Sequence, residues 1–103
     1  MFVRLVKLQI AASSVKDFEQ LFDQYKNEIR HQPGCSHLEL LKDREKEGVF
    51  FTYSVWDEES SLENYRNSEL FGKVWGTAKT FFSGKPEAWS VERIISVGSG
   101  SEQ

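Results

Sequence analysis

His37 is the residue of this sequence best suited to act as a base, because histidine titrates near neutral pH. It lies in a predicted strand, and Glu39 follows two positions later. Alternate residues of a strand share a face, so the Glu39 carboxylate is expected where it can orient the imidazole. We therefore predict His37 as a catalytic base. The alternative is a partly solvated histidine of an edge strand, and the sequence leaves both interpretations open.

Aromatic side chains are predicted to line a pocket for a small planar substrate. Ring faces stack on planar molecules, and a tyrosine hydroxyl can donate to a substrate oxygen. The candidates are Tyr53, Trp56, Tyr65 and Trp75. Aromatic residues at helical or strand spacing are more often core residues, so that alternative stays open for each. Arg93 interrupts an apolar strand face and is predicted to hold an oxyanion or carboxylate, an ordinary surface pair being the alternative.

Composition excludes several classes of function. The 103 residues carry a net charge of −3 with both signs interspersed, which gives no basic surface for nucleic acid. The single cysteine, Cys35, predicts a buried structural thiol, and no Cys/His cluster has the spacing of a metal site. No apolar run approaches the roughly 20 residues that span a membrane, and the N-terminus lacks a signal-peptide pattern. We predict a cytoplasmic protein without metal, membrane or nucleic-acid partner.

The pattern of apolar residues predicts six elements. Period-2 alternation predicts strands, and a stripe at three- and four-residue steps predicts helices. Ser60 with Glu63 fits a capping box, and Ser68 can cap a second helical segment after a break at Asn67. The predicted strands are residues 2–11, 35–42, 49–56 and 87–97. One helix is predicted from an N-cap at Ser13 or Ser14 to about residue 32. A second begins after capping candidates at residues 57–61, breaks at residues 67–68 and ends at residues 84–86.

The order of these elements, βαββαβ, is that of an α+β, ferredoxin-like fold. Right-handed crossovers place both helices on one face of a four-stranded antiparallel sheet. The strand at residues 49–56 has apolar residues on both faces, so the face without helices also needs a cover. A second copy of the chain is the most economical cover, which predicts a homodimer. We expect residues 1–97 to form one domain and residues 98–103 a disordered tail.

Three segments carry a resemblance to a known family: PGCSHLEL at residues 33–40, FFTYSVWDEESSLENY at residues 50–65 and SELFGKVW at residues 68–75. Together they resemble the antibiotic biosynthesis monooxygenase family of dimeric α+β barrels, over about residues 3–97. The resemblance implies a dimeric barrel. It also implies that Tyr65 is a functional residue, because the family has a functional aromatic residue at this position of the second helix.

The same resemblance separates this chain from the haem-degrading members. In those members the second helix carries an aromatic residue, usually Trp, and a haem-ligating His follows ten residues later. Tyr65 and Trp75 stand at these two positions, and the first strand lacks the Asn that those members use. Polyketide-oxidising members have an Asn four positions before the aromatic residue, where this chain has Ser61. This chain therefore lacks part of the set of catalytic residues that the resemblance implies for either group.

Two functions follow as expectations. The first is a monooxygenase that needs no cofactor and oxidises a small quinol-like or polycyclic aromatic substrate with O2. His37 and Tyr65 are its predicted catalytic residues, and Tyr53, Trp56, Trp75 and Arg93 its predicted substrate-binding residues. The second is a non-catalytic dimeric barrel that binds a ligand or serves in a stress response.

Overall fold

Strands and helices alternate in the order predicted for a ferredoxin-like fold. The structure is a computed structural model and describes residues 1–98. The short 3-10 turns η1 (Ala12–Ser14) and η2 (Lys79–Phe81) precede α1 and follow α3. The main elements are β1 (Phe2–Gln9), α1 (Val15–Arg30), β2 (Cys35–Lys42), β3 (Val49–Trp56), α2 (Glu59–Arg66), α3 (Glu69–Ala78) and β4 (Glu87–Val91).

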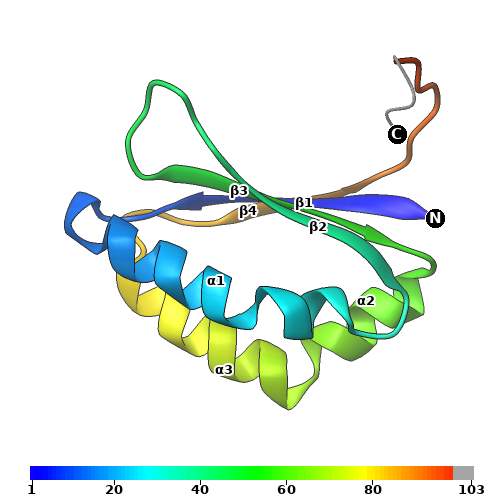
Figure 1. Cartoon of the computed structure of the whole chain (residues 1–103), viewed down its shortest axis with the longest axis horizontal. Helices are drawn as coiled ribbons and strands as arrows, with labels where there is room; N and C mark the ends of the chain where they lie inside the picture. Colours follow the sequence, from blue (N-terminus) through cyan, green and yellow to red (C-terminus); the bar gives the residue numbers. More distant parts are fainter. Residues whose placement is uncertain (99–103) are drawn as a thin grey trace.

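The four strands form one antiparallel sheet in the order β2-β3-β1-β4. All three α-helices lie on one side of this sheet, as Figure 1 shows. The predicted α+β plan, with helices on one face, is thereby confirmed. The opposite side, which we call the open face, carries no helix (Figure 1). The two faces of each strand therefore meet different surroundings, and this decides where the candidate residues lie.

The core lies between the sheet and the helices. One cluster joins β1 and β3 to α1 and α3 through Leu8, Phe50, Phe18 and Ala78. A second cluster lies at the other end of the sheet and contains Cys35, Trp56 and Leu62. The two large side chains with the least exposure, Phe50 and Trp56, both point from β3 toward the helices. Burial of such large apolar side chains is the main contribution that holds the helices against the sheet.

Gly34 forms the tight turn between α1 and β2. Its φ of +90° belongs to the left-handed region that favours glycine. A Cβ at this position would also clash with the side chains of Ser61 and Asp57. The Gly34 carbonyl accepts from the Asp57 amide at 2.9 Å, which ties this turn to the start of α2.

The break between α2 and α3 is confirmed at the predicted position. The Ser68 hydroxyl accepts from the Phe71 amide at 3.1 Å and donates to the Tyr65 carbonyl at 2.6 Å. The predicted capping box of Ser60 and Glu63 is not formed, because Glu58 is the N-cap and shows no side-chain cap bond. The Asp57 carboxylate instead accepts from the Glu58 amide.

The last strand is shorter than predicted, ending at Val91 rather than at residue 97. Val91 pairs with Val3, and β1 begins at Phe2, so the residues after 92 have no partner on β1. The alternation of apolar residues continues to residue 97, but pairing in the sheet does not. The first strand likewise ends at Gln9, with Ile10 forming an isolated bridge to Phe82. Of the predicted tail, residues 98–103, all but Gly98 lie outside the described residues.

Candidate active site

The six predicted site residues fall into two groups on opposite faces of the sheet. Trp56 faces the helices, where Tyr65 stacks on it with ring centroids 5.5 Å apart. Val55, the preceding residue, therefore points to the open face, and Tyr53 shares that face. His37 is opposite Val55 in the ladder, so it also lies on the open face. The two predicted catalytic residues, His37 and Tyr65, are thus separated by the sheet.

A β-bulge decides the orientation of His37. Cys35 pairs with Trp56, whereas His37 pairs with Val55, so two steps along β2 oppose one step along β3. This extra residue reverses the alternation, as β-bulges do. Cys35 consequently points into the helix-side core, and its Sγ donates to the His37 carbonyl at 3.6 Å. Without the bulge His37 would point toward the helices as Cys35 does.

On the open face, His37 has the carboxylate partner that its sequence neighbourhood predicted. Its Nε2 lies 2.7 Å from the Oε2 atom of Glu39. A carboxylate can only accept, so the neutral imidazole carries its proton on Nε2 and keeps the lone pair of Nδ1 free. The pair is half-exposed, with side-chain exposures of 51% for His37 and 46% for Glu39. In this arrangement a carboxylate orients the imidazole, which can then act as a base.

Tyr53 and Arg93 lie beside that base. The His37 ring meets the Tyr53 ring edge-on, with centroids 6.0 Å apart. The Arg93 guanidinium donates to the Tyr53 hydroxyl. Arg93 comes from the segment that follows β4, so residues distant in the sequence meet at one place. A hydroxyl that accepts from a cation becomes a better donor to a developing oxyanion. We call His37, Glu39, Tyr53 and Arg93 the open-face cluster.

Apolar side chains extend the open-face cluster across the sheet. Leu5 of β1 pairs with Tyr53 on one side and with Trp89 of β4 on the other. Trp89 is 45% exposed, which leaves its ring free to meet a planar ligand. Trp89 is not among the site residues predicted from the sequence. Only the cross-strand register places it on the open face, across Leu5 from Tyr53.

The helix-side group forms a row of aromatic rings. Tyr65 stacks on Trp56 and meets Phe71 edge-on, and Phe71 stacks on Trp75 at 5.6 Å between centroids. Phe82 closes the row against Trp75 at 5.4 Å. Such contacts are typical of packed aromatic residues. Within this row Trp56 is only 1% exposed, and its indole N–H donates to the Ser54 hydroxyl at 2.9 Å.

Burial governs the acid–base properties of the helix-side group. Burial raises the pKa of Tyr65 to about 12, with a smaller contribution from the neighbouring Cys35. Burial likewise raises the pKa of the Cys35 thiol. Both groups therefore stay protonated near neutral pH. Tyr65 can donate a hydrogen bond there, but it cannot serve as a base.

The second histidine of the chain, His31, has a structural partner. His31 forms the C-terminal cap of α1, where its Nδ1 donates to the Asn27 carbonyl at 2.7 Å. A histidine at the C-terminal end of a helix interacts favourably with the helix dipole. In the part of the chain that the structure describes, no group of three His, Cys, Asp or Glu side chains is arranged to hold a metal. No helix among residues 1–98 has the length and apolar character needed to cross a bilayer.

Two hollows in the surface border α1 and contain none of the six predicted residues. The first, of about 390 Å³, lies between α1 and β2 over Phe22, Leu38 and Leu40. The second, of about 420 Å³, lies along the polar face of α1 at Lys16, Gln20 and Gln24. Both are open to solvent, and neither gathers a base with an oxyanion donor. The open-face cluster is the better candidate for chemistry.

Comparison with solved structures defines the class of fold. An antibiotic biosynthesis monooxygenase superposes with a TM-score of 0.85 at 15% identity, covering 92% of this chain and 100% of that one. A conserved protein from Methanosarcina mazei Go1 gives 0.83 at 19% identity, covering 90% and 93%. Rv0793 from Mycobacterium tuberculosis gives 0.83 at 10% identity, covering 94% and 98%. These likenesses show the ferredoxin-like fold.

The family follows from the sequence itself. The family model described as antibiotic biosynthesis monooxygenase matches residues 1–75, which is most of the chain. The chain therefore belongs to the antibiotic biosynthesis monooxygenase family, as the resemblance indicated. No curated protein matches the chain. Family and fold are thus established, whereas the substrate and the reaction belong to the proposal below.

Proposed function

We propose that the protein is a cofactor-independent monooxygenase that oxidises a small quinol-like or polycyclic aromatic substrate with O2. Family membership and fold support the class of reaction. The observation that carries the proposal is the open-face cluster, in which a base oriented by a carboxylate adjoins a hydroxyl bound to a cation. These are the groups needed to make and hold a phenolate.

The first step is removal of the phenolic proton. His37 takes it on Nδ1, while its Nε2–H stays bonded to Glu39, which stabilises the imidazolium that forms. The phenolate oxygen then accepts from the Tyr53 hydroxyl and from free N–H groups of Arg93. The substrate ring lies over Leu5 and against the exposed face of Trp89. In this scheme His37 acts as the base, Tyr53 and Arg93 hold the phenolate oxygen, and Leu5 and Trp89 hold the ring.

Electrons for the reaction come from the substrate. An electron-rich phenolate reduces O2 directly, and the reduced oxygen adds to a ring carbon to give a hydroperoxide. Breakage of the O–O bond leaves one oxygen atom on the carbon as a carbonyl and releases the other as water. A substrate that loses two hydrogen atoms in this way and gains one oxygen balances the consumption of one O2. Metal and flavin have no part in this scheme.

A second copy of the chain would complete the site. The cluster is half-exposed in one chain, and oxyanion stabilisation is strongest where water is excluded. We therefore propose a homodimer in which the open faces meet and enclose the substrate. We also propose a cytoplasmic location, because the single cysteine is a buried free thiol and forms no disulfide.

The second candidate is a barrel that binds a small aromatic ligand without reacting. The observation that favours it is the separation of His37 from Tyr65, the two residues predicted to act together. In this alternative the aromatic row of Tyr65, Trp75 and Phe82 accommodates a planar ligand after a local rearrangement. A stress-associated role would follow from such binding alone.

Oxygen uptake with a panel of hydroquinones separates these functions and these sites. His37→Ala should lower the rate of uptake by about 100-fold or more, because it removes the general base. His31→Ala is the matched control and should leave the rate unchanged. Tyr65→Phe should have little effect if the open face is the site. A large loss of oxygen uptake in Tyr65→Phe, with no loss in His37→Ala, would indicate that the reaction takes place on the helix side of the sheet.

A further inference from the structure

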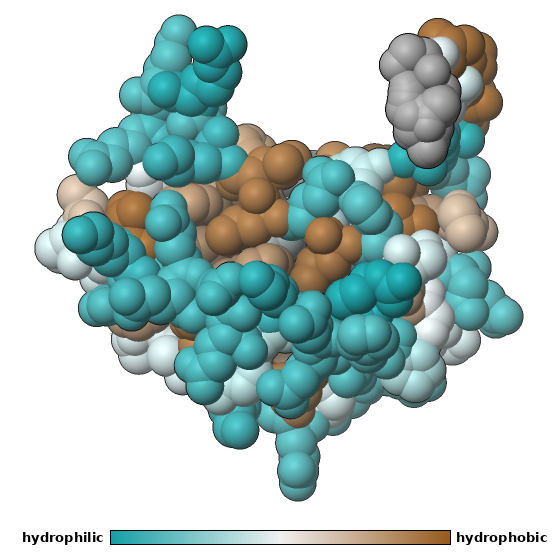
Figure 2. Space-filling model, in the orientation of Figure 1, coloured by the Kyte–Doolittle hydropathy of each residue, from teal (hydrophilic) through white to brown (hydrophobic). Residues whose placement is uncertain are grey.

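The hollow between α1 and β2 has an apolar floor. Phe22 of α1 and Leu38 and Leu40 of β2 line it, and all three side chains are half-buried. Figure 2 shows apolar side chains gathered in the middle of this side of the molecule, between the hairpin loop and the polar side chains of α1. The hollow, of about 390 Å³, has the size of a site for a small ligand.

β2 is an edge strand with outward-facing backbone groups. It stands first in the strand order β2-β3-β1-β4, so within residues 1–98 it has a neighbouring strand on one side alone. The Asp43 amide donates to the Val49 carbonyl of β3 at 2.9 Å. Successive residues of a strand direct their backbone groups alternately to its two sides. The N–H and C=O groups of Leu38 and Leu40 therefore point away from β3, along the rim of the hollow. Edge groups of this kind pair readily with an added strand.

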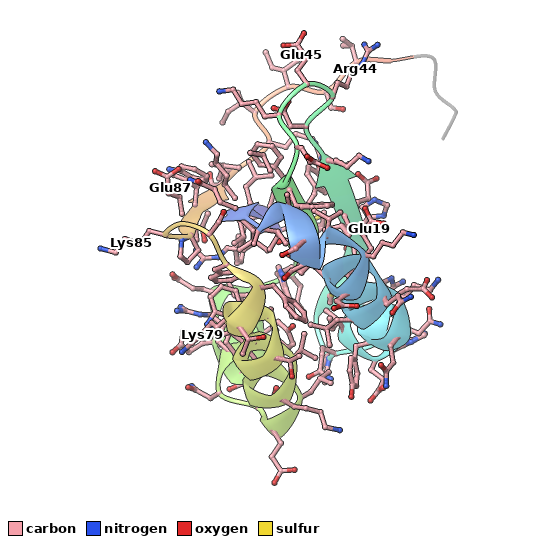
Figure 3. The ribbon with its side chains drawn as sticks, turned by 90° about the vertical axis from the view of Figure 1, so that its left-hand side faces the viewer. Glu19, Arg44, Glu45, Lys79, Lys85 and Glu87 are labelled. Atoms are coloured by element: carbon pink, nitrogen blue, oxygen red, sulfur yellow. The ribbon has the colours of Figure 1, made fainter. Side chains whose placement is uncertain are left out.

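Two opposite charges stand at the ends of the hollow. Glu19 and Arg30 both line it, and about 16 Å separates them along the axis of α1. Neither forms an ion pair in the described part of the chain, whereas Asp23 and Lys26 between them pair with each other at 2.5 Å. Arg30 donates to the Cys35 carbonyl at 2.9 Å, which places it at the start of β2. Glu19 lies toward the other end of β2, and Figure 3 shows it on α1 next to the sheet.

We propose that this edge binds a short apolar peptide with free termini, which adds to β2 as an antiparallel strand. In such strand addition the main-chain hydrogen bonds supply affinity, and pockets for alternate side chains supply specificity. The terminal ammonium of the peptide meets the Glu19 carboxylate, and its terminal carboxylate meets the Arg30 guanidinium. This pairing of charges fixes the antiparallel direction. A span of about 16 Å corresponds to about five residues of extended chain, which sets the length of the peptide.

Strand register decides which peptide side chains enter the hollow. Residues directly opposite each other in an antiparallel pair project to the same face of the sheet. The second and fourth residues of the peptide lie opposite Leu40 and Leu38, so their side chains cover the floor at Phe22. Their N–H groups donate to the Leu40 and Leu38 carbonyls, whereas the N–H group of the third residue points away from β2. Apolar residues are therefore required at the second and fourth positions.

The surroundings of β2 favour a short peptide and keep it apart from the open-face cluster. Lys42 is exposed at the last position of β2, and a lysine on an edge strand discourages pairing with a longer strand. His37 and Glu39 project to the opposite face from Leu38 and Leu40. Peptide binding therefore needs no oxygenation chemistry, and its test is separate from that of the proposed function.

The probe is the peptide Ala-Leu-Ala-Leu-Ala with free termini, titrated into the full-length ¹⁵N-labelled chain and followed by amide shifts in NMR spectra. Saturable shifts are expected at the amides of Leu38 and Leu40. N-methylation of both peptide leucines should raise the Kd by about tenfold or more, because it removes the two donors to β2. N-methylation of the central alanine is the matched control and should leave the Kd unchanged, because that N–H group points away from β2.

Charge reversal at one end of the hollow tests the direction of the peptide. Glu19→Lys should raise the Kd about fivefold, because attraction of the terminal ammonium becomes repulsion. Acetylation of the peptide N-terminus should remove this difference between parent and variant. Glu45→Lys makes the same change at the outer end of the hairpin loop (Figure 3) and should bind the peptide as the parent does. Both side chains are exposed, so thermal unfolding should change little.

Three results would each overturn the inference. The first is the absence of saturable shifts at residues 38 and 40 at any soluble concentration of peptide. The second is an equal Kd for the two N-methylated peptides, which would exclude an added strand. The third is an equal effect of Glu19→Lys and Glu45→Lys, which would exclude the proposed direction.

Discussion

Glu39 gives His37 its orientation, and this dependence can be measured. Glu39→Gln keeps the shape of the side chain but removes the charge that stabilises the imidazolium. We expect kcat to fall with KM little changed, and the loss to be smaller than that in His37→Ala. Steady-state oxygen uptake with the best hydroquinone measures both constants. An unchanged kcat would mean that the contact between Glu39 and His37 has no part in catalysis.

Tyr65 makes a prediction about alkaline stability. Its pKa is about 12 in the folded chain against an ordinary value of 10. A raised pKa means that the unfolded chain loses its proton first, so the contribution of Tyr65 is complete below pH 10 and declines as the pH rises to about 12. A shift of this size corresponds to roughly 2 to 3 kcal/mol.

Urea unfolding from pH 8 to pH 12 tests this prediction. The free energy of unfolding should fall more steeply with pH for the parent than for Tyr65→Phe, which has no proton to lose. The difference between the two curves isolates Tyr65 from the other groups that titrate in this range. Parallel curves would show that the Tyr65 hydroxyl is not buried from solvent.

The residue scale also shows where sequence reasoning fails. The pairing of His37 with Glu39 could be predicted, because strand alternation puts residues two apart on one face. The separation of His37 from Tyr65 could not, since the bulge after Cys35 reverses the face of the strand. Bulges depend on the pairing of two strands and leave no local signal in one of them. The roles of the six candidate residues remain predictions.

Among the elements, the junction of α2 and α3 depends on Ser68. Its hydroxyl satisfies the Phe71 amide and the Tyr65 carbonyl together. Ser68→Ala should lower the free energy of unfolding by about 1 kcal/mol, the usual effect of losing an N-cap. Chemical denaturation gives this value directly. Ser60→Ala is the control and should change stability by less than about 0.5 kcal/mol, because Ser60 is exposed on α2. Equal losses in both variants would contradict this assignment of the cap.

Elements were predictable to the degree that their signals are local. The strands Cys35–Lys42 and Val49–Trp56 were predicted with their observed bounds, because a turn and two alternating runs define them. The cap at Ser68 was likewise a local signal. The end of β4 was not, because it depends on where β1 stops and not on its own residues. The shorter strand leaves Ile94, Ile95 and Val97 exposed outside the sheet, although the sequence pattern predicts them within it.

At the scale of the whole molecule, the layer order was predictable and the quaternary structure remains a prediction. The order of elements and the right-handed crossover rule led to one sheet with helices on one face, which is confirmed. Apolar residues on both faces of β3 raised the question of a cover. The exposed Trp89 and Val91 lie on the open face and locate the surface that needs a cover. The proposed homodimer would cover this surface.

Oxygen-isotope labelling tests the central claim, oxygenation without a cofactor, most directly. Chelator-treated, dialysed protein is incubated with ¹⁸O2 and each hydroquinone or polycyclic phenol of a panel, and the products are analysed by mass spectrometry. The account predicts that at least one substrate gains a single ¹⁸O atom, at a rate far above buffer and above His37→Ala. Rates no higher than buffer across the whole panel would contradict it.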